Sequence, residues 1–357
     1  MGRTILAALA AVMLCAQDAR HVMVYREKGR FGGWPANHGI WSWGNEILVG
    51  FSAAWYKQRD PAVHQMDADK PEEPRLARSL DGGMTWKVET PRSLLPPAQG
   101  GKAVRPLTKA MDFSKPGFAM TLRFTDVHTG PSLLFYSYDK GKSWEGPFEF
   151  PLFGLKGVAA RTDYIVKNAN ECTVFLTGAK QNGREGRPFA ARTKDGGLSW
   201  EFLSWIGPEP KVFAIMPSSL RLKNGDLLTT VRVKQDDDHN WIDAWRSDDE
   251  GKNWRLLGNV GDTGGKSGTA PALVRLKDGR LCLTYGSRTK PFPILARISS
   301  DEGRSWGEPR VLRADAVAWD VGYLRSAVRP DGKVVSVYYY NDAVMPERFI
   351  GATVWTP

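Results

Sequence analysis

The chain contains few of the residues that build metal and redox centres. Its 357 residues include three cysteines and five histidines, and no Cys/His group has the spacing of a zinc site. Cys15 lies in an N-terminal apolar stretch, whereas Cys172 and Cys282 lie far apart in strand-like runs. We expect these last two to be buried free thiols rather than a disulfide, and we expect neither a metal nor another cofactor.

Long hydrophobic runs are also missing. The apolar stretch at residues 5–14 follows Arg3 and is much shorter than the roughly 20 residues that a membrane-spanning helix needs. A positive residue followed by a short apolar stretch is typical of an export signal. The sequence therefore predicts a signal peptide over residues 1–16, a mature chain of residues 17–357, no membrane anchor, and a secreted or periplasmic protein.

Positive charge is in excess but is not concentrated. Lys and Arg number 49 and Asp and Glu 39, a net charge of +10, without any Lys/Arg run long enough for a nucleic-acid-binding arm. Charge spread in this way favours a small anionic ligand over nucleic acid.

No long amphipathic helical pattern is present, and the strongest signal is instead a repeat. The pattern Ser/Thr-x-Asp-x-Gly-x-(Thr/Ser/Asn)-Trp occurs five times, at intervals that shorten from 58 to 52 residues. The copies begin at Ser79, Ser137, Thr193, Ser247 and Ser299. A near-constant period of about fifty residues, with 14 tryptophans and 37 glycines, predicts the blades of a β-propeller.

Each octapeptide has the chemistry of a hairpin turn. Its aspartate can accept hydrogen bonds from backbone N–H groups two or three residues further on, its glycine adopts positive φ without strain, and its tryptophan buries a large ring. We therefore interpret the repeat aspartates as structural, not catalytic. They are Asp81, Asp139, Asp195, Asp249 and Asp301.

A sixth blade follows the five repeats. Residues 319–355 have the same strand pattern but end before a sixth octapeptide, so this blade lacks one strand. Residues 21–26 (HVMVYR) can supply it, which joins the two ends of the chain and leaves no open sheet edge. The prediction is an all-β, six-bladed propeller in one domain, with the last blade closed by the N-terminal strand.

This repeat, at this period and in six blades, resembles the Asp-box (BNR) repeat of the sialidase, or neuraminidase, superfamily. The resemblance covers nearly the whole mature chain, and it implies a set of site residues. Three arginines bind the carboxylate of the sugar, a tyrosine assisted by a glutamate attacks the anomeric carbon, and an aspartate acts as acid and base.

Three residues match the positions that the family uses. Tyr323 opens the first strand of the last blade, eight residues before the turn aspartate Asp331, where the family has its nucleophile. Arg232 and Arg288 end equivalent strands of the fourth and fifth blades, where the family has its second and third arginines. Equivalent strand ends meet at one mouth of a propeller, so we expect both to bind one anion; the alternatives are a core tyrosine and two solvated arginines.

Two positions depart from the family. The first arginine belongs to an Arg-Ile-Pro tripeptide, and here the matching residues are Gly33-Trp34-Pro35, which makes Arg30, or failing it Arg26, the candidate replacement. The assisting glutamate falls near Met216. The sequence offers Glu72, Glu171 and Glu185 as substitutes.

The resemblance places the acid/base on a long loop of the first blade, residues 55–74. Long polar loops in compact domains are often functional. We choose Asp67, whose proton affinity His64 and Lys70 can tune, and we count His64 and Trp34 among the substrate-binding candidates. The alternatives are an acidic loop in solvent and a tryptophan that packs in the core.

These residues predict a retaining exo-sialidase-like glycoside hydrolase that releases a terminal sialic acid or related acidic sugar from a glycan. A glycosidase or lyase for uronic-acid glycans, and a carbohydrate-binding propeller without activity, stay open as alternatives. The sequence leaves the linkage and the oligomeric state undetermined.

Overall fold

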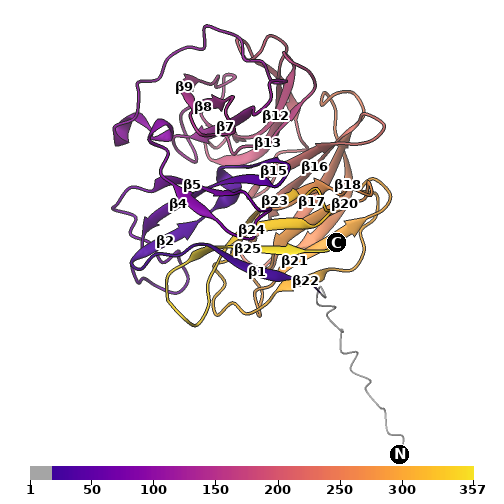
Figure 1. Cartoon of the computed structure of the whole chain (residues 1–357). Coiled ribbons are helices and arrows are strands. Elements are labelled where there is room, and N and C mark those ends of the chain that lie inside the picture. The colour runs from indigo at the N-terminus through magenta and orange to yellow at the C-terminus, as the bar shows by residue number, and fades with distance from the viewer. Residues whose placement is uncertain (1–17) are drawn as a thin grey trace, which may run out of the picture.

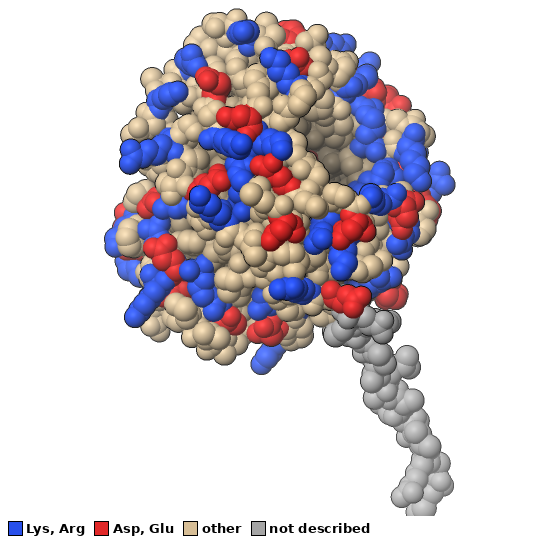
Figure 2. Space-filling model, in the orientation of Figure 1, with Lys and Arg blue, Asp and Glu red and all other residues tan. Residues whose placement is uncertain are grey.

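The computed structural model describes residues 18–357, so the predicted signal peptide, with Cys15, lies outside the described residues. Six antiparallel sheets follow one another around a ring, with colour advancing from indigo to yellow (Figure 1). The predicted six-bladed propeller is confirmed. Among the described residues, no helix has the length and apolar character needed to cross a membrane. On the face shown in Figure 2, Lys and Arg side chains are spread over the surface with Asp and Glu between them.

Each blade is a short meander of strands. Blade one contains β2 (Arg30–Gly33), β3 (Ile40–Trp43), β4 (Glu46–Trp55), β5 (Glu73–Ser79) and β6 (Lys87–Glu89), and blade two contains β7 (Ala119–Phe124), β8 (Ser132–Ser137) and β9 (Glu145–Glu149). Blade three contains β10 (Val158–Ala159), β11 (Tyr164–Val166), β12 (Cys172–Ala179), β13 (Glu185–Thr193) and β14 (Glu201–Trp205), and blade four contains β15 (Phe213–Arg221), β16 (Leu227–Lys234), β17 (Asn240–Ser247) and β18 (Arg255–Asp262). Blade five contains β19 (Ala272–Arg275), β20 (Leu281–Gly286), β21 (Ile294–Ser299) and β22 (Arg310–Arg313), and blade six contains β23 (Gly322–Val328), β24 (Val334–Tyr340), β25 (Phe349–Trp355) and β1 (Arg20–Tyr25).

The two ends of the described chain close the ring, as predicted. Strand β1 pairs antiparallel with β25, with Arg20 opposite Val354 and Met23 opposite Gly351, and the two strands lie side by side in Figure 1. Val24 is buried in an apolar core shared by blades six and one. The closure therefore hides the edge of β25 that would otherwise offer unpaired backbone groups.

The five repeats form five equivalent turns. In the first, one carboxylate oxygen of Asp81 accepts hydrogen bonds from the backbone N–H groups of Met84 and Thr85 at 3.0 and 2.9 Å, and the other accepts from the Thr85 hydroxyl at 2.6 Å. The donors thus lie three and four residues beyond the aspartate, one further than predicted. Burial opposes ionisation, but the hydrogen bonds from Thr85 and Ser79 outweigh it and lower the pKa of Asp81 to about 2. These aspartates hold turns, as the sequence indicates.

Cys172 and Cys282 are buried and free, as predicted. Cys172 lies in β12 and Cys282 in β20, each inside the apolar core of its own part of the ring. Burial raises the pKa of the Cys282 thiol to about 12, which keeps it protonated and unreactive.

Blade two differs from the others because it has no inner strand. The innermost strands of the other five blades, β3, β11, β15, β19 and β23, line a central cavity of about 290 Å³, whereas blade two begins directly with β7. The chain before β7 instead forms two short 3-10 turns, η2 (Arg92–Leu94) and η3 (Pro97–Gln99). Side chains of blade three cover part of the exposed β7 edge: the Thr162 hydroxyl accepts from the Leu122 N–H, and the Tyr164 hydroxyl from the Met120 N–H. The ring is consequently open beside blade two.

Candidate functional site

A groove of about 1330 Å³ occupies the opening beside blade two. Polar and aromatic side chains from blades one, two, three and six line its inner end, and mostly apolar residues of the segment before β7 and of blades two and three line its outer end. The inner group is Trp34, Asn37, His64, Glu72, Arg123, Arg161 and Tyr323. The groove therefore joins a polar end near the propeller axis to an apolar outer part.

Tyr323 is directed into this inner end by an irregularity of its strand. The pairing of β23 with β24 shifts between Gly322 and Arg325, and Tyr323 has a φ of 52°, a strained value for a bulky residue. Backbone strain of this kind concentrates at functional sites. Its ring packs edge-on against Tyr339, with centroids 5.8 Å apart.

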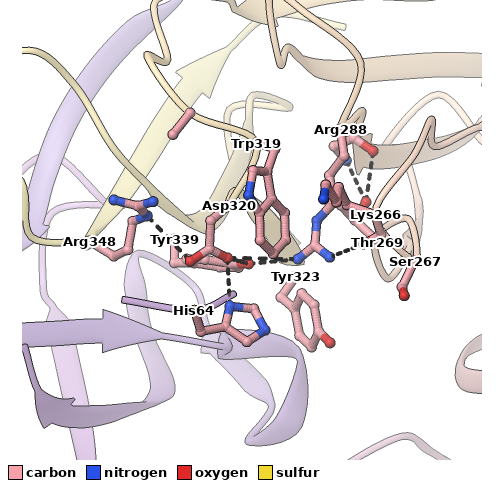
Figure 3. Close-up of polar contacts among 12 residues, drawn as sticks. His64, Lys266, Ser267, Thr269, Arg288, Trp319, Asp320, Tyr323, Tyr339 and Arg348 are labelled. Atoms are coloured by element: carbon pink, nitrogen blue, oxygen red, sulfur yellow. Dashed lines mark hydrogen bonds and ion pairs between the residues drawn. The ribbon is translucent and has the colours of Figure 1, made fainter. Parts of the chain in front are cut away.

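The two predicted arginines converge on Tyr323. Arg232 Nη1 donates to the Tyr323 hydroxyl oxygen at 2.9 Å, and the Arg288 guanidinium carbon lies 5.8 Å from the Tyr323 ring centre. The loop that contains Lys266 and Ser267 fixes both guanidinium groups: Arg288 donates to the Lys266 carbonyl and Arg232 to the Ser267 carbonyl. Figure 3 shows Arg288, this loop and Tyr323 together. The structure thus brings together the three residues that carry the family resemblance.

The local charge alters the ionisation of the tyrosine. Burial opposes ionisation of the phenol, but the positive charges of Arg232, Arg288 and Arg161 outweigh burial and lower the pKa of Tyr323. An arginine-rich site of this kind stabilises a phenolate and attracts anions.

Met216 lies where the family resemblance expects a glutamate. Its sulfur accepts a hydrogen bond from Arg232 Nη1 over 3.5 Å, and its φ of 58° marks a second strand irregularity facing Tyr323. Among residues 18–357, no carboxylate forms a hydrogen bond with the Tyr323 hydroxyl. Of the three glutamates offered as substitutes, Glu185 pairs with Arg161 and Glu171 with Lys167, while Glu72 lines the groove.

A third arginine, which the sequence analysis missed, completes the cationic group. Arg161 follows the first strand of blade three, and its guanidinium is held by the Glu185 carboxylate and, at 3.0 Å, by the Asn37 side-chain oxygen. In the sequence, Arg161 follows a short apolar run, Val158-Ala159-Ala160, just as Arg232 and Arg288 follow the strands of their blades. This similarity could have identified Arg161 as a candidate. Arg30 does not line the groove: it pairs with Glu73 at 3.1 Å and stacks on Trp55.

Arg123 is a fourth arginine at the groove, on the uncovered strand of blade two. Its Nε and Nη2 atoms are buried without a hydrogen-bond partner among the described residues. Burial without a neutralising carboxylate lowers the pKa of Arg123 to about 10. An unpaired buried cation is costly to a folded protein, so this position is suited to receive an anion.

His64 and Asp67 lie on the same loop but have different surroundings. His64 Nδ1 lies 2.8 Å from Asp320 Oδ1 (Figure 3), and its ring meets Trp34 edge-on with centroids 5.5 Å apart. Asp67 does not line the groove; its carboxylate pairs with Lys57 at 3.1 Å and with Lys70 at 3.7 Å. The hydrogen bond from Lys57 is the main cause of a lowered pKa of Asp67. The predicted acid/base role of Asp67 stays a prediction.

Glu72 is the carboxyl group that lines the groove on this loop, near His64. Removal from water raises the pKa of Glu72. Trp34, which the sequence analysis counts among the substrate-binding candidates, also lines the groove, with a φ of 56°.

The fold and the groove define a class of protein, an Asp-box propeller with arginines in the wall of a groove. Residues 119–335 match the BNR repeat-like domain family. Because this match spans more than half of the chain, the protein belongs to that family. No curated protein sequence matches the chain.

Several solved structures share the fold. A protein of unknown function from Dyadobacter fermentans is 20% identical, with a TM-score of 0.72 and coverage of 94% of this chain and 98% of that one. A mutant of Trypanosoma rangeli sialidase with trans-sialidase activity is 14% identical, with a TM-score of 0.62 and coverage of 96% of this chain but 59% of that one. An α-L-arabinanase from Penicillium chrysogenum is 16% identical, with a TM-score of 0.59 and coverage of 94% and 98%. At these identities the comparisons show the fold alone.

Proposed function

We propose that the protein is a glycoside hydrolase that releases a terminal acidic sugar, sialic acid or a close relative, from a glycan bound in the groove. The observation that carries this proposal is the convergence of two arginines on Tyr323: Arg232 donates to its hydroxyl and Arg288 lies beside its ring, with Arg161 close enough to lower the pKa of Tyr323. Sialidases with a tyrosine nucleophile use this combination of groups, and two sialidases share the fold.

The arginines favour an anionic sugar over a neutral one. Arg123 has no partner, and Arg288 Nε is likewise buried without one among the described residues. A carboxylate between such guanidinium groups gains charge-assisted hydrogen bonds and removes the cost of unpaired charge. A neutral sugar leaves the buried guanidinium of Arg123 without a charged partner among the described residues.

Tyr323 is the proposed nucleophile. Its lowered pKa increases the fraction of phenolate, and a phenolate attacks the anomeric carbon while the arginines hold the sugar carboxylate. The proton donor belongs to the blade-one loop of residues 56–72, on which the sequence predicts Asp67. Covalent catalysis in two steps retains the anomeric configuration.

The place of action follows from the N-terminal sequence. We propose that residues 1–16 direct export and that residues 17–357 act as a single propeller domain outside the cytoplasm. Glycans outside the cell are then the substrates.

A second candidate reaction is the elimination of a uronic-acid glycan. Its support is the absence, among residues 18–357, of a carboxylate bonded to Tyr323. A phenolate can instead remove the proton next to a carboxyl group that arginines neutralise; the neighbouring C–O bond then breaks, a C=C bond forms, and the departing oxygen takes the proton from the phenol, which restores the phenolate.

A substrate panel tests the proposed function. Purified protein is assayed on fluorogenic glycosides of sialic, glucuronic and galacturonic acid, on the matching neutral glycosides, and on uronic-acid polymers monitored for ultraviolet absorption of an unsaturated product. The proposal expects cleavage of acidic aryl glycosides only. Cleavage of neutral glycosides alone contradicts it, an unsaturated product establishes the elimination, and binding without any cleavage establishes a carbohydrate-binding protein.

A further inference from the structure

We infer that His64, held in place by Asp320, is the residue that donates and later removes the proton in this groove, in place of Asp67. This inference rests on the proposed function, and it names a residue that the sequence analysis considered for substrate binding and for tuning Asp67, but not as the acid/base itself. The two partners lie 256 positions apart in the chain, so their contact is visible only in the structure.

The imidazole has one fixed and one available nitrogen. Asp320 is fully buried, and its oxygen Oδ1 lies 2.8 Å from His64 Nδ1. Contacts with His64, Arg348 and Arg288 outweigh burial and lower the pKa of Asp320 to about 2, so this carboxylate is ionised and can only accept a hydrogen bond. Nδ1 must therefore carry a proton, which leaves Nε2 as the nitrogen that exchanges a proton with substrate.

Asp320 is itself fixed by surrounding groups. The Tyr339 hydroxyl donates to Oδ1 at 2.5 Å, Arg348 Nε lies 3.3 Å from Oδ2, and Arg288 Nη2 lies 3.9 Å from Oδ1. The imidazole packs against the rings of Trp34 and Trp319. His64 therefore has a defined orientation although it lies on a loop, and a catalytic group needs such orientation.

The same network places His64 close to the nucleophile. Tyr339 connects Asp320 to the nucleophile, since its hydroxyl donates to Asp320 while its ring packs against Tyr323. His64 and Tyr323 both line the groove, and two aromatic rings link them, since His64 packs against Trp34, Trp34 against Tyr339, and Tyr339 against Tyr323; Figure 3 shows His64, Tyr339 and Tyr323 around Asp320. The His64 side chain is 34% exposed, so a substrate oxygen has access to Nε2.

The proton balance of the reaction is complete with these two residues. In the first step the Tyr323 phenolate bonds to the anomeric carbon, the bond to the leaving oxygen breaks, and His64 Nε2–H gives its proton to that oxygen. In the second step water attacks the anomeric carbon, His64 takes the proton of the water, and the phenolate leaves. The net reaction is hydrolysis, and it returns an imidazolium and a phenolate to the site.

Asp67 is poorly suited to this task. A general acid must hold a proton near the operating pH, whereas two lysines stabilise the ionised form of Asp67. Its carboxylate is also absent from the groove wall.

The test compares His64→Gln with Asp67→Asn on aryl glycosides of one acidic sugar, with leaving groups that range from activated to poor. Loss of a proton donor lowers kcat/KM about 10²-fold or more for poor leaving groups and much less for activated ones. We expect this dependence on the leaving group in H64Q but not in D67N. We also expect azide to restore the turnover of activated substrates by H64Q, because azide attacks the anomeric carbon without the help of a general base. His239→Gln is the matched control, because His239 forms the same 2.8 Å contact with Asp236 in solvent, away from the groove.

The outcomes separate this inference from the proposed function. The inference is wrong if the unaltered protein is active but H64Q loses the same factor of activity on every substrate and azide does not restore it. His64 is then not the acid/base. The leaving-group dependence in D67N instead of H64Q assigns the role to Asp67. Inactivity of the unaltered protein on every acidic glycoside contradicts the proposed function and this inference together.

Discussion

The Arg232 guanidinium donates a hydrogen bond to the Tyr323 hydroxyl oxygen over 2.9 Å. The two residues lie 91 positions apart and belong to blades four and six. The contact exists because a strand irregularity turns Tyr323 inward and because loop carbonyls fix Arg232. A guanidinium in this position stabilises a phenolate, and Met216, which also contacts Arg232, occupies the place where the family resemblance expects a glutamate.

Tyr323→Phe removes only one hydroxyl group. If the phenolate is the nucleophile, turnover of an acidic aryl glycoside should fall by about 10³-fold or more, whereas loss of one hydrogen bond should cost only about 1 kcal/mol of the free energy of unfolding. Steady-state kinetics and urea unfolding measure the two quantities. Unchanged turnover in a folded variant would exclude Tyr323 from the chemistry.

Arg288→Ala tests recognition of the carboxylate. Removal of one partner of a buried charge pair costs about 2–5 kcal/mol, so we expect binding of a carboxylate-bearing inhibitor to weaken by at least about 30-fold, with little effect on the analogue reduced to an alcohol. Arg187→Ala is the control, because Arg187 stacks on Trp205 and donates to the Gly207 carbonyl, whereas Arg288 lies beside Tyr323. Isothermal titration calorimetry gives both affinities, and equal weakening of acid and alcohol by R288A would argue against carboxylate recognition.

Asp139→Ala tests the structural interpretation of the repeats. Its carboxylate accepts from the N–H groups of Lys142 and Ser143, each at 2.9 Å. Loss of such a turn should lower the free energy of unfolding by on the order of 1 kcal/mol and leave kcat/KM unchanged. Asp238→Ala, in an exposed turn, serves as control for the charge change. Activity lost at unchanged stability would show that Asp139 has a role beyond the turn.

Asp163→Asn tests a buried carboxyl in the central cavity. Burial raises the pKa of Asp163 to about 7, although Arg325 and hydrogen bonds from Ser219 oppose this shift. The folded chain therefore retains a proton that the unfolded chain releases above about pH 4, and stability from this group falls as pH rises from about 4 to 7. D163N removes this dependence, so its stability relative to the unaltered protein should increase from pH 5 to pH 8. Parallel pH profiles of thermal unfolding would refute the assignment.

The sequence predicts the parts of this fold that depend on local contacts. Each repeat contains both its aspartate and the groups that bond to it, so Asp81 and its four counterparts reveal the turns directly. Closure by residues 21–26 follows from counting strands. The missing inner strand of blade two was not predicted, because neighbouring residues such as Thr162 and Tyr164 replace its hydrogen bonds.

The sequence could predict those residues of the candidate site whose place depends only on their position within a blade. Arg232, Arg288 and Tyr323 meet because equivalent strand ends face one mouth of the ring. Sequence reasoning could not separate His64 from Asp67, three residues apart, since their partners Asp320 and Lys57 come from different parts of the chain. Arg161 was not predicted, because the family resemblance places no carboxylate-binding arginine in blade three.

Identification of the residue that becomes bonded to the sugar tests the central claim most directly. The protein is incubated with an activated fluorinated acidic glycoside, which slows the second step, and is then digested and mapped by mass spectrometry. The account predicts a sugar adduct on Tyr323 and none on the Y323F variant. An adduct on Asp67 or Glu72 would contradict it. Hydrolysis of the compound with inversion at the anomeric carbon, and without any adduct, would contradict it as well.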